Sequence, residues 1–530
     1  MQPQYKRSAP STTDTAKFAG CHRCGPSFLI IAGGNLPRLS LPRTVLSPAL
    51  PLFLCLSAPS LVAQTAPPVS ADVQKHIHNV EAGLLPAVVI KDAPHQTHTL
   101  AERMAAMHVN GVSIAVIHNG QIEWARGYGV ATIGGPQVTP ETLFQAGSIS
   151  KPVAALAALR MVQQGKLTLD ADVNSMLKSW KLPDAPVAAG KPVTLRELLT
   201  HTGGTTVHGF PGYASDSRVP TLVQVLNGET PANTPAIRIE AQPGTRWNYS
   251  GGGFTIMQQL VIDQSGEAFP KLLDDTVLTP NGMTHSTYRQ PLPADRKALA
   301  ATPYDAEGQP IPGGAHTYPE MAAAGLWTTP SDIARYAIEV QTSLAGKSNH
   351  VLSQEMTKAM LTPGLGGWGL GVQLGGAKAN PYFTHGGVNE GFESLFVAYE
   401  QSGEGAVVMT NAQGGSAIAD EIMHSIAAEY NWPDEKPEVR AAVTVDPKLL
   451  ADYAGKYELG PDYDITFQVV DGHLTLQAPG QETLQLYASS NSRFFLSVMN
   501  AELEFVRDDK GKVAKLVLHQ NGQDVVAQKK

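Results

Sequence analysis

Ser148 and Lys151, a hydroxyl and an amine three residues apart, are the residues of this 530-residue chain that most directly suggest chemistry. Positions i and i+3 of an α-helix share a face. A serine hydroxyl is a weak nucleophile at neutral pH and needs a neighbouring base. A lysine can be that base when burial or nearby positive charge lowers its pKa. The pair therefore predicts attack of Ser148 on a carbonyl carbon and transfer of an acyl group to the serine.

The sequence after Lys151 predicts the helix that holds this pair. Residues 152–162 are rich in Ala and Leu, Pro152 is tolerated in a first helical turn, and Gly165 is suited to end a helix. Ser148 would then lie at the N-terminus of a buried helix, where the helix dipole favours negative charge on its oxygen. The spacing alone is weak evidence, because a capping serine followed by a solvated lysine gives the same pattern.

Two further segments carry residues that complement the pair. Residues 243–251, Pro-Gly-Thr-Arg-Trp-Asn-Tyr-Ser-Gly, include Tyr249, and residues 383–388, Phe-Thr-His-Gly-Gly-Val, include His385. A phenol with an ordinary pKa of about 10 acts as a base only beside positive charge, which Lys151 can supply. The two groups would titrate as a coupled pair, and the sequence leaves open which is the working base. Glycines within a strand allow a ligand or another backbone to approach closely.

With these segments in this order, the chain resembles the serine β-lactamase-related family, which contains class C β-lactamases, D-alanyl-D-alanine carboxypeptidases, D-aminopeptidases and family VIII carboxylesterases. The family has a Ser-x-x-Lys motif, a Tyr-x-Asn motif and a Lys-Thr-Gly or His-x-Gly motif. Residues 198–204, 324–332 and 367–371 also resemble it, and the likeness runs from about residue 80 to about residue 430.

The resemblance implies a role for each matched side chain. Ser148 would be the nucleophile that forms an acyl-enzyme, with Lys151 as proton acceptor or electrostatic partner. Tyr249 would be the motif tyrosine. His385 would lie on an edge strand that lines the site and would bond to substrate or to the tyrosine; a histidine can be neutral there, whereas a lysine is a cation.

The resemblance also implies an oxyanion hole and shows one departure. The N–H of Val388, which follows Gly387, would form the oxyanion hole with the N–H of Ser148. The departure is Gly251, which stands where the family usually has an asparagine that helps to hold the lysine and the substrate amide. Asn248 is not expected to substitute for it. We therefore expect acyl transfer to be retained and lactam hydrolysis to be disfavoured.

The pattern of strands and helices predicts an α/β (α+β) fold. A strand at 112–118, a type I′ turn and a strand at 121–127 form one hairpin, 395–399 and 406–410 form a second, and 418–430 form a helix. The resemblance implies an antiparallel sheet flanked by helices, with a helical lobe beside it and the serine between them. From 447 onward, short alternating strands predict a small β-barrel or sandwich that resembles a lipocalin-like domain. The expected domains are a leader (1–63), a linker (64–80), the hydrolase domain (81–431), a second linker (432–446) and the barrel (447–530).

The N-terminal segment predicts export. Arg38 and Arg43 precede an apolar run at 45–56 that is followed by small residues, with cleavage expected after Ala63. The run is too short for a permanent membrane span, and the protein is expected to be periplasmic or secreted. All three cysteines, Cys21, Cys24 and Cys55, lie in this leader, so we expect neither a disulfide nor a thiol nucleophile in the mature protein.

Other classes of function find little support. The formal net charge is −8 and no basic stripe stands out, so nucleic-acid binding is not expected. Ser148 has no Gly-x-Ser-x-Gly elbow, and the chain has no His-Glu-x-x-His, Walker or Rossmann pattern. We expect no metal and no other cofactor.

The sequence thus predicts an exported serine hydrolase that acts on a small ester or amide through an acyl-Ser148 intermediate. Carboxylesterase or D-amino-acid-type peptidase activity comes first. A β-lactamase, or a penicillin-binding sensor that acylates once without turnover, is the alternative. The C-terminal domain is a candidate surface for oligomerisation.

Overall fold

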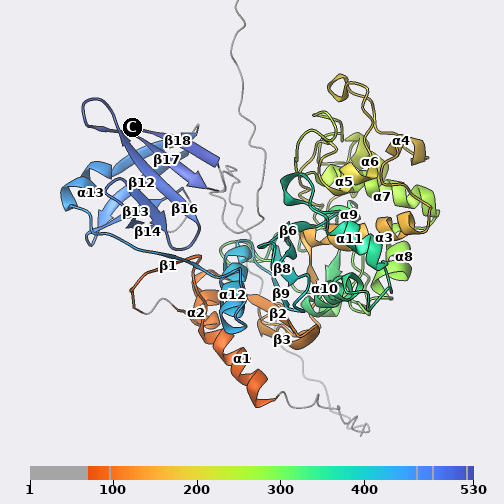
Figure 1. Cartoon of the computed structure of the whole chain (residues 1–530), viewed down its shortest axis with the longest axis horizontal. Helices are drawn as coiled ribbons and strands as arrows, with labels where there is room; N and C mark the ends of the chain where they lie inside the picture. Colours follow the sequence, from red (N-terminus) through yellow and green to blue (C-terminus); the bar gives the residue numbers. More distant parts are fainter. Residues whose placement is uncertain (1–69, 95–96, 461–462, 480–482, 521–522) are drawn as a thin grey trace, which may run out of the picture.

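The computed structural model describes residues 70–94, 97–460, 463–479, 483–520 and 523–530. Its central element is a six-stranded antiparallel sheet with the strand order β3-β2-β9-β8-β7-β6 (Figure 1). The strands are β2 (Gly111–His118), β3 (Gln121–Gly129), β6 (Gln373–Gly375), β7 (Tyr382–Asn389), β8 (Phe392–Tyr399) and β9 (Gly405–Thr410). The predicted closure of the sheet by distant segments is confirmed, because β2 pairs with β9 from Val112 opposite Thr410 onward.

Both predicted hairpins are present. Asn119 and Gly120 join β2 to β3 with φ values of 53° and 74°, as a type I′ turn requires. Strands β8 and β9 pair with Leu395 opposite Val408.

Helices cover both faces of the sheet, and the alternation of side chains along β2 shows why. Ile114 and Val116 join the core formed with α1 (Ala71–Ala82) and α12 (Gly415–Glu429). Ala115 and Ile117 join the larger core on the opposite face, which includes α10 (Pro330–Leu344) and the helical lobe. Successive residues of a strand point to opposite faces, so β2 is buried on both sides.

Helix α1 differs from the expectation of a linker at 64–80. Residues 71–82 form a helix that begins after the capping side chain of Ser70. Its apolar residues Ile77 and Val80 are buried among residues of α12. The Pro-rich composition that suggested a linker ends before Ser70, and the apolar side of α1 then packs against the domain.

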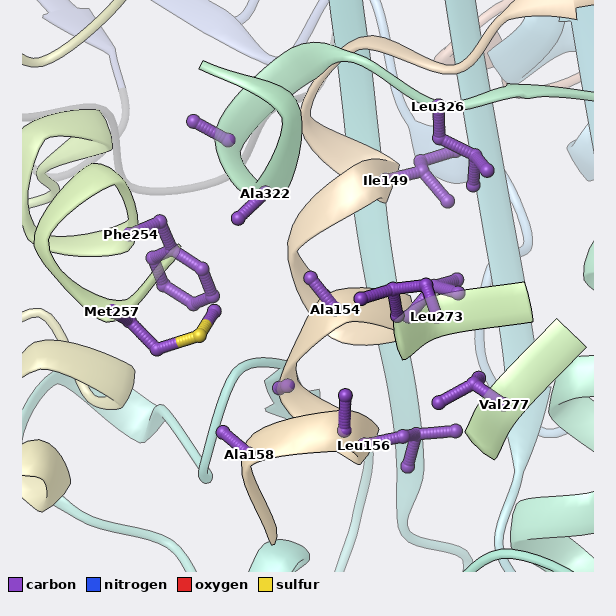
Figure 2. Packing of buried hydrophobic residues seen from close by; sticks show 14 of the residues in the cluster. Ile149, Ala154, Leu156, Ala158, Phe254, Met257, Leu273, Val277, Ala322 and Leu326 are labelled. Atoms are coloured by element: carbon purple, nitrogen blue, oxygen red, sulfur yellow. The ribbon is translucent and has the colours of Figure 1, made fainter. Parts of the chain in front are cut away.

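The helical lobe forms around α3 (Ser150–Gln163), which the sequence predicted with its end near Gly165. Most of α3 is buried, and its buried residues lie on all sides of the helix rather than along one stripe. Figure 2 shows that Phe254 and Met257 of α7 (Gly251–Ser265), Ala322 of α9 (Met321–Ala324) and Leu273 of α8 (Phe269–Leu273) surround it. A helix enclosed on all sides is a rigid support for the residues at its first turn.

Shorter elements complete the domain. They are α2 (Leu100–Ala106), β4 (Phe144–Gln145), η1 (Gly147–Ile149), α4 (Val173–Met176), η2 (Pro186–Ala188), α5 (Leu195–Leu199), α6 (Leu222–Asn227), η3 (Asp274–Leu278), η4 (Lys297–Leu299), β5 (Trp327–Thr328), α11 (Gln354–Met360) and η5 (Leu365–Gly367). Among the described residues, none of the helices is long and apolar enough to cross a membrane.

The C-terminal region is a closed eight-stranded barrel, which confirms the predicted small β domain. After α13 (Pro447–Tyr453) its strands are β11 (Gly455–Gly460), β12 (Tyr463–Val470), β13 (His473–Gln477), β14 (Leu484–Ala488), β15 (Arg493–Leu496), β16 (Ala501–Arg507), β17 (Val513–Gln520) and β18 (Gln523–Lys529). Tyr457, Phe467 and Phe505 pack edge to face in its interior. The barrel core is thus filled by side chains.

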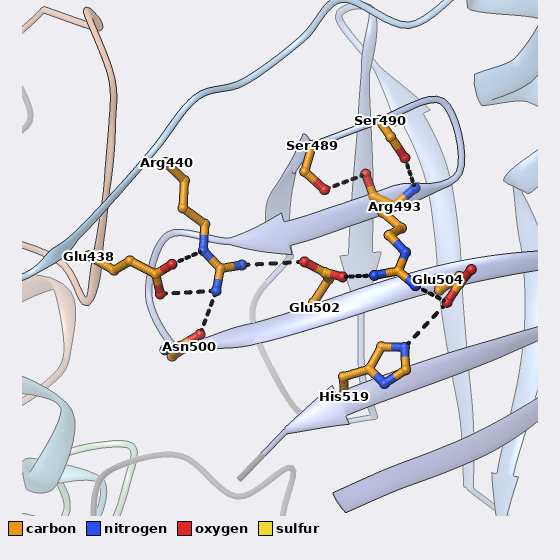
Figure 3. A network of polar contacts seen from close by, with 9 residues as sticks. All are labelled: Glu438, Arg440, Ser489, Ser490, Arg493, Asn500, Glu502, Glu504 and His519. Carbon is orange, nitrogen blue, oxygen red and sulfur yellow. Dashed lines mark hydrogen bonds and ion pairs between the residues drawn. The ribbon is translucent and has the colours of Figure 1, made fainter. Parts of the chain in front are cut away.

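The segment expected to be a second linker contains a strand. Residues Glu438–Arg440 form β10, which pairs in parallel with β1 (Val88–Ile90). The N–H of Val88 also donates to Ser497 O at 2.9 Å, which ties this pair to the barrel. Figure 3 shows the polar contacts that continue from β10 across the barrel strands, a chain of residues formed by Glu438, Arg440, Glu502, Arg493, Glu504 and His519.

Candidate active site

Ser148 and Lys151 are brought together at the start of α3. Ser148 lies in the short 3-10 turn η1 and Lys151 in the first turn of α3. Lys151 Nζ lies 2.8 Å from Ser148 Oγ, within hydrogen-bond distance. The lysine is only 2% exposed, whereas Ser148 is partly exposed. The nucleophile candidate is therefore accessible and its partner amine is enclosed.

The surroundings of Lys151 hold its amine against Ser148. Nζ donates a second hydrogen bond to Ala323 O of α9 at 2.8 Å. It also lies 5.0 Å from the centre of the Tyr249 ring and 5.9 Å from that of Phe254, distances typical of cation–π contacts. The side chain thus crosses from α3 to a position between α9 and α7, and little freedom remains for it to turn away.

Tyr249 lies in an aromatic cluster immediately before α7. Its ring packs 4.2 Å from that of His201 and 5.8 Å from that of Trp368, measured between ring centres. Trp247 lies against Trp368 at 5.5 Å. Tilted and edge-to-face ring contacts on several sides hold the phenol ring in one orientation beside Lys151.

His385 lies in β7 close to the same cluster and is neutral. Its Nδ1 lies 2.6 Å from Gly386 O, and because a carbonyl only accepts, Nδ1 carries the proton. Burial, with the nearby charge of Lys151, lowers the pKa of His385 to about 3. Nε2 is then an acceptor, and it has no hydrogen-bond partner among the residues that the structure describes. Nε2 is suited to accept a hydrogen bond from an N–H or O–H group of a substrate.

His385 was expected on an edge strand, and β7 is an edge strand over only part of its length. Strand β6 pairs with β7 at residues 382–384, so the outer edge of β7 becomes free from His385 onward. The turn from β7 to β8 has two residues, so Asn389 and Phe392, which close the turn, form a hydrogen-bonded pair. Hydrogen-bonded and non-hydrogen-bonded pairs alternate along antiparallel strands, so the next pair, Val388 and Glu393, is not hydrogen-bonded. The N–H of Val388 therefore points away from β8, along the free edge.

That free edge lies directly against η1. A methyl group placed on Gly147 would lie 2.5 Å from Val388 N, and one placed on Gly387 would lie 1.9 Å from Ala146 O and 3.2 Å from Ser148 N. Only glycine fits at both positions, because backbone rather than flexible side chain fills the space. The backbone around the amides of Ser148 and Val388 is thus in close contact, and an oxyanion hole needs two backbone amides that lie close together.

Phe210 explains the glycine that replaces the family asparagine. A methyl group at Gly251 would lie 2.8 Å from Phe210 Cε2, so this ring takes the space that a longer side chain would need. Asn248 does not take over the missing function, because its amide donates to Glu240 Oε1 at 2.8 Å. Lys151 Nζ instead donates its second hydrogen bond to the carbonyl oxygen of Ala323.

Two buried residues near the site were missed by sequence reasoning. His201 belonged to a segment that resembled the family but received no role, and it proves to contact Tyr249. Glu320 immediately precedes α9, is 0% exposed, and neither carboxyl oxygen has a hydrogen-bond partner in the described part of the chain. Burial raises the pKa of Glu320 to about 8. A carboxylic acid separated from the motifs gives no local signal in a sequence.

The structure thus brings the residues predicted from the motifs into one place: Ser148, Lys151, Tyr249, His385, Gly387 and Val388. Over the described residues, no group of three or more His, Cys, Asp or Glu side chains is arranged to hold a metal ion. A buried lysine beside a serine, a phenol beside that lysine, and two converging backbone amides can carry out acyl transfer with protein groups.

Comparison with known proteins agrees with this fold. Residues 97–429 match the family described as Beta-lactamase, and residues 439–529 match a domain of unknown function, DUF3471. The first match spans more than half of the chain. The protein therefore belongs to the Beta-lactamase family, whose members are generally serine hydrolases.

Three proteins illustrate the relationship. Penicillin-binding protein 4 of Amycolatopsis lactamdurans is 26% identical over 385 residues, covering 66% of this chain and 93% of that protein. Protein flp of Staphylococcus aureus (strain MRSA252) is 23% identical over 339 residues, covering 60% of this chain and 63% of that protein. The octameric penicillin-binding protein homologue from Pyrococcus abyssi has a TM-score of 0.55 at 24% identity, covering 81% of this chain and 98% of that one. The structural likeness establishes the fold.

Proposed function

We propose that the protein is an exported serine hydrolase that cleaves a small ester or amide through an acyl-Ser148 intermediate. The observation that carries this proposal is the distance of 2.8 Å between Ser148 Oγ and the buried Nζ of Lys151. A lysine that is held against a serine by a second bond, here to Ala323 O, is placed to take or share the serine proton. Export rests on the leader at 1–63, which lies outside the described residues.

Acylation would proceed in two steps. Ser148 Oγ attacks the substrate carbonyl carbon while its proton passes to the coupled pair of Lys151 and Tyr249. The negative charge that develops on the carbonyl oxygen is stabilised by the N–H groups of Ser148 and Val388. The carbon–heteroatom bond then breaks, and the leaving alcohol or amine takes the proton from the pair. Water completes the cycle by attacking the acyl group and releasing a carboxylic acid and free Ser148.

Within the proposed class of esters and D-amino-acid-type amides, we expect esters to be the better substrates. Phe210 fills the space beside Gly251 that the family asparagine side chain would need. Without that asparagine, an ester, which has no N–H to satisfy, loses less binding than an amide does. Penicillin recognition is the second candidate, because a relative that shares 26% identity is named a penicillin-binding protein. The expected partners are thus small ester, peptide or lactam molecules. We also propose that copies of the protein associate through the C-terminal barrel.

The decisive experiment measures the intact mass of the mature protein after brief exposure to a penicillin or to p-nitrophenyl acetate, while product is followed in solution. We expect a covalent adduct on Ser148 with at least one of the two compounds. The variant Ser148→Ala should form none, and its turnover should fall by about 10⁴-fold or more. Wild-type turnover that survives unchanged in Ser148→Ala would contradict the mechanism.

The two compounds also separate the candidates. Turnover of the ester with untouched penicillin indicates an esterase, and ring-opened penicillin in excess over enzyme indicates a lactamase. A stable penicilloyl adduct without steady turnover indicates a sensor, because acyl-enzyme accumulates when deacylation is blocked.

A further inference from the structure

His201 binds the backbone on both sides of Tyr249. Its carbonyl oxygen accepts the N–H of Asn248 at 2.8 Å, and its ring Nδ1 accepts the N–H of Ser250 at 3.1 Å. The tyrosine between these two residues therefore has its neighbours anchored to one histidine. We call this arrangement the His201 clamp.

The ring of the same histidine contacts the tyrosine side chain. The His201 and Tyr249 ring centres are 4.2 Å apart with an angle of 34° between their planes. Trp368 contacts His201 edge to face at 5.0 Å. His201 thus restrains Tyr249 twice, through the backbone and through the face of the phenol ring that it covers.

The backbone of His201 is in an uncommon conformation. Its φ of 57° lies in the left-handed region, which only a few per cent of non-glycine residues adopt, although histidine does so more often than most. This conformation lets the carbonyl and the side chain of one residue reach the same segment. Strained backbone of this kind is concentrated at functional sites, where the surrounding structure enforces it.

The protonation state of His201 suits this task. Because Nδ1 accepts the Ser250 N–H, it carries no proton, and the neutral ring carries its proton on Nε2. Burial, followed by the charge of Lys151, lowers the pKa of His201 well below its usual value. The ring stays neutral beside Lys151, so it does not compete with the lysine for negative charge that develops on Tyr249 or on the substrate.

We propose that His201 is the positioning residue that holds the Tyr249 phenol against the Ser148–Lys151 pair during acylation. The inference rests on the proposed function, since it assigns a role within the transfer of the serine proton. His201 does not touch the reacting atoms; it acts through Tyr249. Loss of the clamp should let the phenol move by a fraction of an ångström, and misplacement of about 1 Å can cost about 100-fold in rate.

Three substitutions separate the features of the clamp. His201→Asn keeps an acceptor in the place of Nδ1 and tolerates a positive φ. His201→Gly tolerates a positive φ but has neither acceptor nor ring. His201→Phe keeps a ring but has no acceptor. With p-nitrophenyl acetate we expect kcat to fall about 10- to 100-fold in the glycine and phenylalanine variants with KM little changed. The asparagine variant should recover most of that loss.

A double-mutant cycle with Tyr249→Phe shows whether His201 acts through the tyrosine. Without the phenol hydroxyl there is nothing left to position, so His201→Gly should cost little more in the Tyr249→Phe background. Additive losses would overturn the proposal, as would an asparagine variant as slow as the glycine variant. His424→Phe is the control, because it removes another partly buried histidine, which lies 3.2 Å from Leu85 O and belongs to α12 on the opposite face of the sheet from α3 and α7. It should leave kcat unchanged.

A second measurement does not depend on any substrate. Hydrogen–deuterium exchange of peptides covering 245–252 should be slow in the wild-type protein and in His201→Asn, and faster in His201→Gly, because the Ser250 N–H then loses its acceptor. Rapid exchange in the wild-type protein would overturn the clamp. If the clamp is present but Ser148 is never acylated by an ester or a penicillin, the proposed function fails while the geometry of the clamp stands.

Discussion

At the scale of single residues, burial determines the charge around Ser148. His385 and His201 are both kept neutral by burial and by the charge of Lys151. The positive charge at the nucleophile therefore comes from the lysine, whose amine is 2.8 Å from Ser148 Oγ. Replacing His385 by lysine would bring a second cation into this enclosed space, where like charges disfavour each other.

Glu320 gives a prediction about pH. Burial raises the pKa of Glu320 to about 8, whereas a carboxyl in an unfolded chain has a pKa of about 4. Between these values the folded protein keeps a proton that the unfolded chain releases, so the free energy of unfolding falls as pH rises. The expected slope from this group is about 1 kcal/mol per pH unit.

The variant Glu320→Gln keeps the shape of the side chain and removes its ionisation. Between pH 5 and pH 8 we expect its thermal unfolding midpoint to fall less than that of the wild-type protein. The midpoint of the variant should exceed that of the wild-type protein by the largest amount at pH 8. Thermal unfolding followed by circular dichroism at several pH values measures this. Parallel pH profiles for the two proteins would show that Glu320 does not titrate in this window.

At the scale of elements, the site depends on the contact between η1 and the free edge of β7. The Ser148 amide belongs to a helical turn and the Val388 amide to a strand, and the two elements are far apart in sequence. They can meet because Gly147 and Gly387 leave no side chain between them. The first N–H groups of a helical turn have no partner within the turn. We therefore expect this contact to leave the Ser148 N–H available to bind an oxyanion.

The substitution Gly387→Ala tests this contact. Its methyl group would lie 1.9 Å from Ala146 O, so β7 and η1 must separate. We expect kcat for p-nitrophenyl acetate to fall by about 100-fold or more, since one oxyanion donor is typically worth that much. Gly209→Ala is the control, because a methyl group there meets nothing within 4 Å. Equal kcat values for the two variants would show that the contact is not needed.

At the scale of the whole molecule, the barrel is attached to the hydrolase domain through β1 and β10 (Figure 1). Strands β1 and β10 pair with each other, and Val88 and Ile90 pack with Phe495 of the barrel. Arg440 joins the two regions, because it bonds to Glu438 at 2.8 Å, to Asn500 at 2.9 Å and covers the Phe495 ring at 5.3 Å.

Replacing Arg440 by methionine should weaken this connection. The ion pairs are partly exposed, so we expect a loss of about 1 kcal/mol in docking of the barrel. Limited proteolysis should then cut the segment 431–446 faster than in the wild-type protein, with kcat for the ester little changed. Arg507→Met is the matched control, because Arg507 also pairs with a carboxylate, Asp452 at 3.0 Å, and covers Tyr453 at 5.6 Å, but within the barrel. Equal cutting rates in the two variants would contradict the role of Arg440 in holding the barrel to the hydrolase domain.

The local features of the fold were predictable from the sequence alone. The Asn119-Gly120 turn, the helix that follows Lys151 and the alternating strands of the barrel each depend on residues adjacent in the chain, and the structure confirms them. The pairing of Ser148 with Lys151 was also predictable, because one helical turn separates them. Helix α1 was missed, because its capping serine follows a Pro-rich stretch that indicated a linker.

The rest of the site depends on contacts between segments that are distant in the chain. Ala323, whose carbonyl oxygen accepts a hydrogen bond from Lys151, is 172 residues away from it in the chain. His201 is about 50 residues from the segment around Tyr249 that it contacts. No local sequence pattern links either pair. The same holds for Phe210 beside Gly251 and for the unpartnered carboxyl of Glu320. Burial and close approach are properties of packed surfaces, and they set charge, space and orientation only after the chain has folded.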